Sequence, residues 1–335
     1  MTNISAETRI PEAAVEREDR LEIPQSAQPI RLYKQYVVAL GLVHGLALAA
    51  FIPWFFSWTG LMAGIAGVFL FAMMGINIGY HRLLTHRGFT CPKWFEHTLA
   101  LLGICTLQDS PARWVAIHRL HHKDSDEQAD PHSPLVSAYW AHLGWLFVRN
   151  QEFYQYSDYE WYVRDLLRDP FYLRLERNAL WLKVYCLHAF LFLLAGYAFG
   201  WFATGTLQGS VQMGLSLLVW GVFVRTVFVL HSTWAVNSLT HLWGYRNYST
   251  SDNSRNNWLV ALISHGEGWH NNHHAEQMSA SHGHLWYEFD FSWWVIRGLE
   301  CAGLVHNVVR PRCWKAVGTP AAMRTKVPSL GSGHP

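Results

Sequence analysis

Residues 60–86 read GLMAGIAGVFLFAMMGINIGYHRLLTH, an apolar run that ends directly in two histidines. Residues 60–79 carry no charged side chain, and about 20 such residues in a helix cross the hydrocarbon core of a bilayer. A helix over this stretch therefore delivers His81 and His86 to one surface of a membrane. The sequence on either side indicates what surrounds that surface.

Three further stretches have the length and apolar composition of a membrane span, at about 36–56, 179–202 and 208–231. Together with 60–79 they form two closely spaced pairs, and the short connection within each pair predicts a helical hairpin. The prediction is an all-α integral membrane protein with four transmembrane helices in two hairpins. Residues 97–107 are also apolar but too short to span, so we expect them to pack beneath the bilayer or dip into it.

The positive charges indicate how these helices are oriented. The hairpin tips, near 57–59 and 204–207, contain no Lys or Arg, whereas basic residues gather before the first span, between 82 and 177, and after Arg225. Because positively charged loops stay on the cytoplasmic side, we expect the termini and the long middle segment to form a cytosolic helical cap. We expect the fourth helix to continue into the cytosol, so that Arg225 and His231 leave the lipid.

Composition excludes several classes of protein. The formal net charge of +2 is too small to indicate a nucleic-acid partner. The five cysteines form no C-x-x-C pair, which argues against disulfides and thiolate metal sites. Residues 1–30 mix charges with prolines and lack the apolar core of a signal peptide. We therefore expect a disordered N-terminal tail over 1–30, a membrane domain over 31–315 and a flexible C-terminal tail over 316–335.

Histidine is unusually abundant, with 20 residues against 24 Asp and Glu combined. Three clusters stand out: HRLLTH at 81–86 directly after the second span, HRLHH at 118–122 in the middle segment, and HNNHH at 270–274 beyond the fourth span. Asn237 and His241 add another i, i+4 pair. In HRLHH and HNNHH the i, i+3 and i+4 spacing places three imidazoles on one helix face, about 5–6 Å apart. The clusters therefore predict a metal site built from imidazole.

Nine histidines in these positions are too many for one ion, so two metals that share them are the simplest arrangement. His81 and His86 are five residues apart, which allows them to approach different metals. Imidazole suits Zn, Cu, Fe and Ni, and composition leaves the metal open, although zinc sites usually close with four ligands.

The other histidines have a simpler interpretation. His132 and His265 lie near the clusters but break their spacing, which favours a supporting or structural role. Isolated histidines are more often capping or core residues than ligands, and this group comprises His44, His97, His142, His188 and His306.

With these residues in view, the chain resembles the membrane fatty-acyl desaturases of the stearoyl-CoA (delta-9) type, over about residues 31–312. The segments HRLLTH, HRLHH and HNNHH are similar to that family's three histidine boxes, in order and in separation. Shorter segments also resemble the family: Asp130-Pro-His132, His142-Leu-Gly-Trp145, Asn237-Ser-Leu-Thr-His241 and Gly266-Glu-Gly268.

The resemblance implies a four-span fold whose cytosolic cap holds two iron ions. It also implies an O2-dependent reaction that removes two hydrogens from a CH2–CH2 pair and makes a cis double bond. Asn237 matches a residue that reaches one iron through water. The positions that match the direct iron ligands are His81, His86, His118, His121, His122, His241, His270, His273 and His274.

A saturated acyl chain offers no polar group near the reacting carbons, so the protein must orient it by a tunnel that fixes depth and bend. The resemblance implies that Gln108, Trp114, Thr233 and Trp234 shape the bent acyl chain. Ordinary packing at a helix boundary is the alternative role for these four residues.

Motifs that this chain lacks indicate which acyl carrier and which electron donor it uses. Animal acyl-CoA desaturases carry Arg-Asp directly before the second box, where this chain has Ala116-Ile117. At this position the chain looks more like the bacterial and cyanobacterial members, which act on lipid-bound chains. The substrate expected is thus an acyl-lipid or acyl-CoA. Arg113 is a candidate contact for an anionic head group, and a solvated surface arginine is the alternative role. With no cytochrome b5 domain or four-cysteine motif, the resemblance implies a separate ferredoxin or cytochrome b5-like donor with its reductase. It also implies a bacterial inner membrane as the location.

Two other functions share part of this pattern. A membrane diiron hydroxylase uses similar histidine boxes but inserts oxygen. A non-catalytic metal-binding or transport protein is expected to place its ligands near the bilayer midplane, whereas these clusters lie at or beyond the ends of spans.

Overall fold

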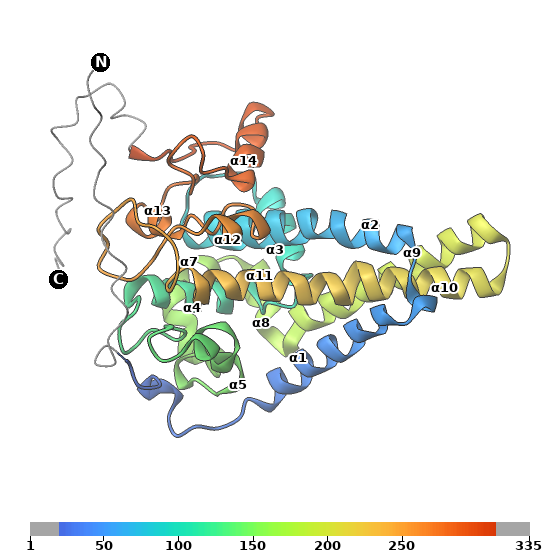
Figure 1. The fold of residues 1–335 in the computed structure, drawn as a ribbon, viewed down its shortest axis with the longest axis horizontal. Coiled ribbons are helices and arrows are strands. Elements are labelled where there is room, and N and C mark those ends of the chain that lie inside the picture. The colour runs from blue at the N-terminus through green and yellow to red at the C-terminus, as the bar shows by residue number, and fades with distance from the viewer. Residues whose placement is uncertain (1–19, 313–335) are drawn as a thin grey trace, which may run out of the picture.

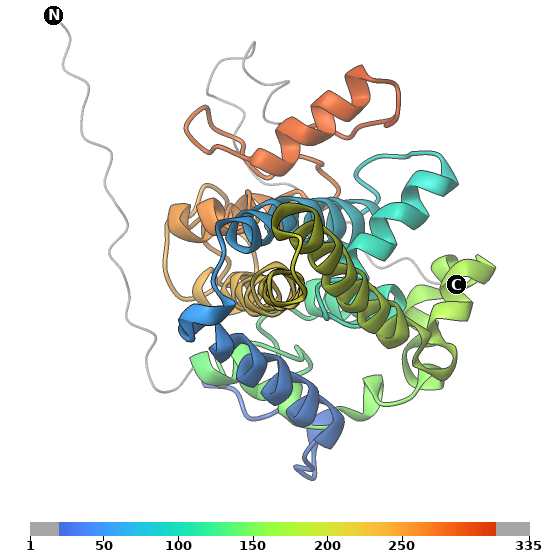
Figure 2. The ribbon, with the colours of Figure 1, turned by 90° about the vertical axis from the view of Figure 1, so that its right-hand side faces the viewer.

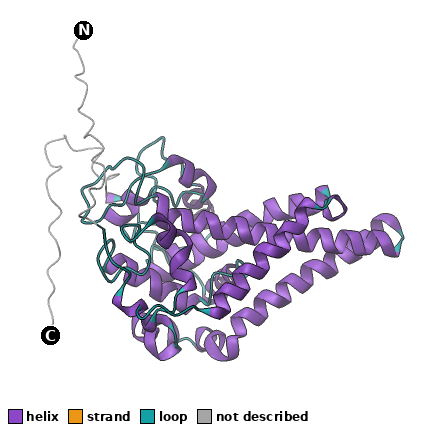
Figure 3. Cartoon of the chain, turned by 60° about the horizontal axis from the view of Figure 1, so that its bottom comes forward, coloured by secondary structure: helices purple, strands orange, loops and turns teal. Residues whose placement is uncertain are grey.

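The computed structural model describes residues 20–312, and within this range the chain is helical and contains no β-strand (Figure 3). The α-helices are α1 Lys34–Ala47, α2 Trp58–Gly67, α3 Lys93–Ile104, α4 Pro111–Lys123, α5 Trp145–Phe147, α6 Tyr156–Tyr159, α7 Arg164–Leu167, α8 Pro170–Glu176, α9 Leu180–Thr204, α10 Leu207–Leu218, α11 Arg225–Leu239, α12 Trp258–Ile263, α13 His270–Ala275 and α14 Phe291–Cys301. Three segments are π-helices, η5 Val68–Thr85, η6 Trp140–Gly144 and η10 Val219–Val224. The short 3₁₀ turns are η2 Gln25–Ala27, η3 Leu48–Phe51, η4 Pro53–Phe55, η7 Gln151–Phe153, η8 Glu160–Val163 and η9 Arg177–Ala179.

Four continuous helical stretches are long and apolar enough to cross a membrane. The longest helices extend together from an end of the molecule at which the short helices and loops gather (Figures 1 and 3). The four stretches are Lys34–Phe51, Trp58–Thr85, Pro170–Thr204 and Leu207–Leu239. The predicted all-α protein with four candidate spans is confirmed at this level.

Glycines allow α9 and α10 to pack closely along each other. A Cβ added at Gly196 would lie 2.7 Å from the carbonyl oxygen of Met213, and one at Gly200 would lie 2.5 Å from that of Gly209. Small residues at such contacts are typical of helix pairs in lipid. The first span differs, since only 11% of it is buried, and α1 packs on α5, α11 and η10 at the margin of the bundle (Figure 2).

Arg225 stays inside the protein, although its helix continues to Leu239 as expected. The residue is 1% exposed and donates a 2.7 Å hydrogen bond to the carbonyl oxygen of Cys105, at the C-terminal end of α3. It also lies 3.3 Å from Nε2 of His188 and 4.1 Å from the ring centre of Phe71. The negative end of the α3 dipole and the aromatic face stabilise the charge. Arg225 is therefore shielded by neighbouring helices. That this helix carries Arg225 out of the lipid stays a prediction.

The short apolar stretch expected beneath the bilayer forms α3, which crosses η5 at glycines. A Cβ at Gly75 would lie 2.3 Å from the backbone nitrogen of Gly103. Because backbone atoms cannot rotate away, we expect Gly75→Ala to lower the free energy of unfolding by about 1–3 kcal/mol. Thermal unfolding in detergent measures the effect. Gly41→Ala is the matched control, since nothing lies within 4 Å of a Cβ there, and equal stability of the two variants would contradict the close crossing.

The ends of the chain are described only in part. Within the predicted N-terminal tail, residues 20–30 are described, and the backbone N–H of Leu21 donates a 3.2 Å hydrogen bond to the carbonyl of Leu135. Residues 1–19 and the predicted C-terminal tail over 316–335 lie outside the described residues. The division into two tails and one membrane domain stays a prediction.

Candidate metal centre

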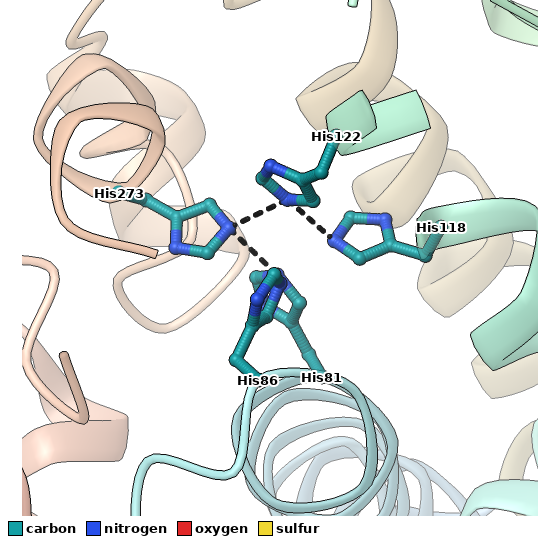
Figure 4. A group of neighbouring side chains, drawn as sticks. All are labelled: His81, His86, His118, His122 and His273. Carbon is teal, nitrogen blue, oxygen red and sulfur yellow. Dashed lines mark hydrogen bonds between the residues drawn. The ribbon is translucent and has the colours of Figure 1, made fainter. Parts of the chain in front are cut away.

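The first group of histidines joins the end of η5 to α4 and α13. One ring nitrogen from each of its five members lies within 4.8 Å of the corresponding nitrogens of the other four. The members are His81, His86, His118, His122 and His273. Nε2 of His273 lies 3.1 Å from Nε2 of His81 and 2.9 Å from Nε2 of His122, and the latter atom lies 3.0 Å from Nε2 of His118. The five rings point toward one another (Figure 4).

The second group lies directly beside the first. It consists of His121, His241, His270 and His274, whose ligand atoms again lie within 4.8 Å of one another and whose side chains are all buried. Nε2 of His270 lies 3.1 Å from Nε2 of His241. The ring centres of His274 and of His122, from the first group, are 4.4 Å apart. The nine predicted histidines therefore form two adjacent groups.

The two HxxHH motifs each serve both groups. In α4, the rings at positions 118 and 122 belong to the first group, while His121 belongs to the second. In α13 the assignment is reversed, because His273 belongs to the first group and the rings at 270 and 274 to the second. Residues four apart share a helix face more closely than residues three apart, so the pair four apart stays together. The prediction that one helix can offer ligands to two neighbouring sites agrees with this arrangement.

The two histidines of HRLLTH lie in the same group, so the expectation that they approach different metals is wrong. Five residues along an α-helix turn by about 500°, which would place His81 and His86 about 140° apart. This helix ends in π form instead, and the N–H of His86 donates to the carbonyl of His81 at 3.2 Å. The i→i+5 hydrogen bond brings the two ring centres to 4.8 Å, in edge-to-face contact.

Buried carboxylates support four of these histidines from behind. In each case Nδ1 of the imidazole lies 2.5–3.0 Å from a carboxylate oxygen. Such a partner accepts the Nδ1 proton, fixes the ring and leaves the lone pair of Nε2 free for a metal. The pairs are His81 with Glu267, His121 with Asp130, His241 with Asp126 and His274 with Asp252.

Electrostatics keep these carboxylates charged and most of the imidazoles neutral. Burial raises the pKa of Asp130, but the adjacent His121 outweighs it and holds the pKa below its usual range. The same balance, with His274 as the partner, lowers the pKa of Asp252. Burial first and neighbouring imidazoles second hold the pKa well below its usual value for His86, His118, His122, His270 and His273. Neutral imidazole is the form that binds metal.

Three of the ligand nitrogens have no hydrogen-bond partner within residues 20–312. They are the buried Nε2 atoms of His86, His121 and His274. A buried acceptor left in this way costs about 1–3 kcal/mol, which a cation between the rings would remove. Two nitrogens about 2.1 Å from one ion lie about 3.0 Å apart when they meet it at a right angle. The separations of 2.9–3.1 Å therefore fit metal ions in both groups.

The Asp130 carboxylate provides a direct test of this support. We expect Asp130→Asn to weaken metal retention by about 10–100-fold, because an amide can donate to Nδ1 of His121 and move the ring proton to Nε2. Metal content after exposure to a chelator measures the effect. Asp165→Asn is the control, since that carboxylate is partly exposed and pairs with Arg119 and Arg87. Equal retention in both variants would contradict the role of Asp130.

Asn237, the predicted ligand through water, lies on α11 and lines a cavity that His270 also lines. The expected i, i+4 pair with His241 is not formed on one helix. The helix ends at Leu239, and His241 follows in a turn, where Asp126 holds it at 2.9 Å. Asn237 thus lies near the second group, because it lines the same cavity as His270.

All four predicted tunnel residues line this one cavity, whose volume is about 110 Å³ and whose wall also includes His81 and His118. The side chains form a short network across it. Nε2 of Gln108 donates to Oγ1 of Thr233 at 3.0 Å, and Nε1 of Trp114 lies 3.4 Å from Oε1 of Gln108. The remaining residue, Trp234, is 4% exposed and lines the same space. A chain bound there would pass the histidines of both groups.

Sequence reasoning missed several residues that complete the centre. Asp126 and Asp252 carry no motif, and Glu267 was noted only as part of a matching segment. His282 is fully buried, and its ring centre lies 4.3 Å from that of His273. A lone histidine has no spacing signal, so nothing in the sequence distinguished it. The supporting role expected for His132 agrees with its place beside His121 and Asp130.

The comparisons with known proteins agree with this geometry. Residues 57–303 match the model of a family described as "Fatty acid desaturase". The chain belongs to this family. It is 42% identical over 274 residues to an sn-2 palmitoyl-lipid 9-desaturase of Nostoc sp. (strain 36), covering 82% of this chain and 89% of that protein.

Two further relatives show how the family varies. An sn-1 stearoyl-lipid 9-desaturase of Anabaena variabilis is 40% identical over 288 residues, covering 86% of this chain and 97% of that protein. An acyl-CoA C20 Delta5-desaturase of Anemone leveillei is 37% identical over 276 residues, covering 82% and 81%. The predicted oxidoreductase that desaturates fatty-acyl chains is confirmed, and the hydroxylase and non-catalytic alternatives are set aside.

Proposed function

We propose that this desaturase introduces a cis double bond at the delta-9 position of a lipid-bound acyl chain and that two iron ions occupy the histidine groups. The observation that carries the proposal is the convergence of nine histidines into two adjacent groups beside one cavity. The proposed ligands are those nine histidines, with Asn237 reaching the second group through water.

The iron pair, when bound, would supply O2 activation and the oxidation of two C–H bonds. In the overall reaction, O2, two electrons and two protons from outside and two hydrogens from the chain give two waters and one double bond. The residues of this chain orient the substrate and keep bulk water away. The Gln108–Thr233 hydrogen bond and the rings of Trp114 and Trp234 form the wall against which the chain would bend.

The charges around the cavity favour a lipid over CoA as the carrier. Arg113 lines the cavity, but it is paired with Asp109 at 3.4 Å and donates to the hydroxyl of Tyr36 at 2.7 Å. Its charge is therefore balanced within the wall. The residues before the second box, Ala116 and Ile117, add no charge. A carrier with several phosphates would find little to bind here, which agrees with the lipid substrates named for the two cyanobacterial relatives.

The charge distribution supports the proposed topology. We infer two helical hairpins whose uncharged tips face outward, with the termini and the histidine groups on the cytoplasmic side of a bacterial inner membrane. Electrons would come from a separate ferredoxin or cytochrome b5-like protein with its reductase, docking on the basic cytoplasmic face.

Expression in a host without its own acyl desaturase tests the proposed function. The expected result is cis-monoenes in extracted membrane lipids, with the double bond at carbon 9. The new monoenes should appear in the lipids rather than in the acyl-CoA pool. Hydroxylated chains in place of monoenes would favour the alternative chemistry, and saturated lipids despite full membrane insertion and electron supply would overturn the proposal.

A further inference from the structure

Three histidines outside the metal groups form a continuous line between helices. Nε2 of His44, on α1, lies 3.1 Å from Nε2 of His231, on α11. Nδ1 of His231 lies 3.0 Å from Nε2 of His142, on η6. Nδ1 of His142 in turn lies 3.0 Å from the hydroxyl oxygen of Ser238. From the sequence, His44 and His142 are expected to be isolated capping or core residues.

The hydrogen bonds of this line determine one tautomer for each ring. The carbonyl of Leu40 lies 2.7 Å from Nδ1 of His44 and can only accept, so that nitrogen carries the proton. Nε2 of His44 then accepts from His231, and Nδ1 of His231 accepts from His142. Both ring-to-ring bonds are thus made with neutral rings, while the single hydroxyl proton of Ser238 serves either Nδ1 of His142, at 3.0 Å, or the carbonyl of Trp234, at 2.8 Å. The central ring is held at both nitrogens, and it cannot turn without breaking two bonds.

The arrangement is a line and not a metal site. His231 uses one nitrogen toward each neighbour, so the three rings do not direct lone pairs at a common point. Their effect must therefore come from what they hold in place.

The ring that they hold is Trp234. Its centre lies 5.0 Å from that of His231, 5.9 Å from that of His142 and 6.5 Å from that of His44, with the first two in edge-to-face contact. Such contacts fix the orientation of a ring beyond simple packing. Trp234 is 4% exposed and lines the cavity beside the metal groups, so the histidine line supports one part of the cavity wall from behind.

We propose that the His44–His231–His142 line fixes Trp234 in the cavity wall and thereby selects which carbon pair of the acyl chain is desaturated. This inference rests on the proposed function. Along a saturated chain every CH2–CH2 pair has similar chemistry, so only its position relative to the metal groups distinguishes one pair from the next. Displacements of about 1 Å are known to change reaction rates by about 10²-fold. A Trp234 ring free to turn would therefore admit neighbouring carbon pairs. The three histidines are positioning residues, since they do not line the cavity themselves and act on it through Trp234.

His231→Leu tests the proposal, because it keeps an apolar side chain of similar length and removes both hydrogen bonds. The variant is expressed in the desaturase-deficient host, and the double-bond positions in its lipids are determined by mass spectrometry. We expect the share of products other than the main isomer to rise at least about fivefold, with iron per chain unchanged. His231→Gln, which can both donate and accept, should restore most of the selectivity. His97→Leu is the control, since His97 bonds Asp169 and stacks on Phe171 away from the cavity.

Each outcome decides between the claims. An unmodified chain that makes no monoene overturns the proposed function, whatever the variants do. Monoenes from the unmodified chain together with the same isomer ratio in His231→Leu overturn the positioning role, whether or not iron is lost. If His231→Leu fails to accumulate in the membrane, His44→Leu and Ser238→Ala break the line at its two ends and are judged by the same ratio.

Discussion

The variant His121→Ala is expected to insert normally in the membrane yet to show no measurable desaturase activity. His121 is 1% exposed, its Nδ1 is held by Asp130 at 3.0 Å, and its Nε2 lies among the ligand atoms of the second group. Its loss leaves three histidines there, while the first group keeps all five. We therefore expect iron to fall from about two ions per chain to about one, because binding depends on the full ligand set.

Activity, iron per chain and membrane content are measured on the same preparation. His306→Ala is the control, since this residue is exposed and belongs to neither group. His122→Ala, which removes a ligand of the first group instead, should likewise lose activity and about one iron per chain. An active His121→Ala enzyme with two irons would remove this residue from the ligand set.

The second large effect is expected for Glu267→Ala. One carboxylate oxygen of Glu267 lies 2.5 Å from Nδ1 of His81, and the other accepts hydrogen bonds from Arg82 at 2.9 and 3.1 Å. Arg82 is 1% exposed and its remaining carboxylate partner is Asp290, at 2.9 Å. Removal of Glu267 leaves a buried cation with one of its two carboxylate partners, which costs about 3–5 kcal/mol of stability. It also frees the His81 ring, and we expect metal retention to fall about 10–100-fold.

Thermal unfolding and iron retention distinguish these two contributions. Glu267→Gln keeps the volume and one acceptor, so its loss of stability should be smaller. Glu127→Ala, at an exposed position, should change neither quantity. A Glu267→Ala protein that melts and retains iron like Glu127→Ala would show that the carboxylate supports neither neighbour.

The four candidate spans and the histidine clusters could be predicted because each rests on a local pattern. Four apolar stretches of the necessary length appear in the sequence, and the structure extends three of them, as in Trp58–Thr85 where 60–79 was expected. The first, expected over 36–56, ends earlier, at Phe51. The HxxHH motifs placed three rings on one helix face without revealing how the two groups would share them. That division depends on the relative rotation of α4 and α13, which arises from packing.

Other features depend on contacts that no local pattern reveals. The π-form end of η5 brings His86 over His81, although the spacing of five suggested opposite directions. Asp126 supports a histidine 115 residues away, and Asp252 supports one that lies 22 residues later. The shielding of Arg225 by α3 likewise required the crossing of distant helices. Long-range contacts, not composition, separate these residues from ordinary acidic and basic side chains.

The central claim is that two iron ions share the nine histidines. Iron analysis combined with Mössbauer spectroscopy on the purified, active enzyme tests it most directly. We predict about two irons per chain with spectra of nitrogen-rich, non-haem sites, and the loss of both signal and activity when iron is removed by a chelator. Full activity in protein that contains no iron, or one iron per chain at saturation, would contradict it.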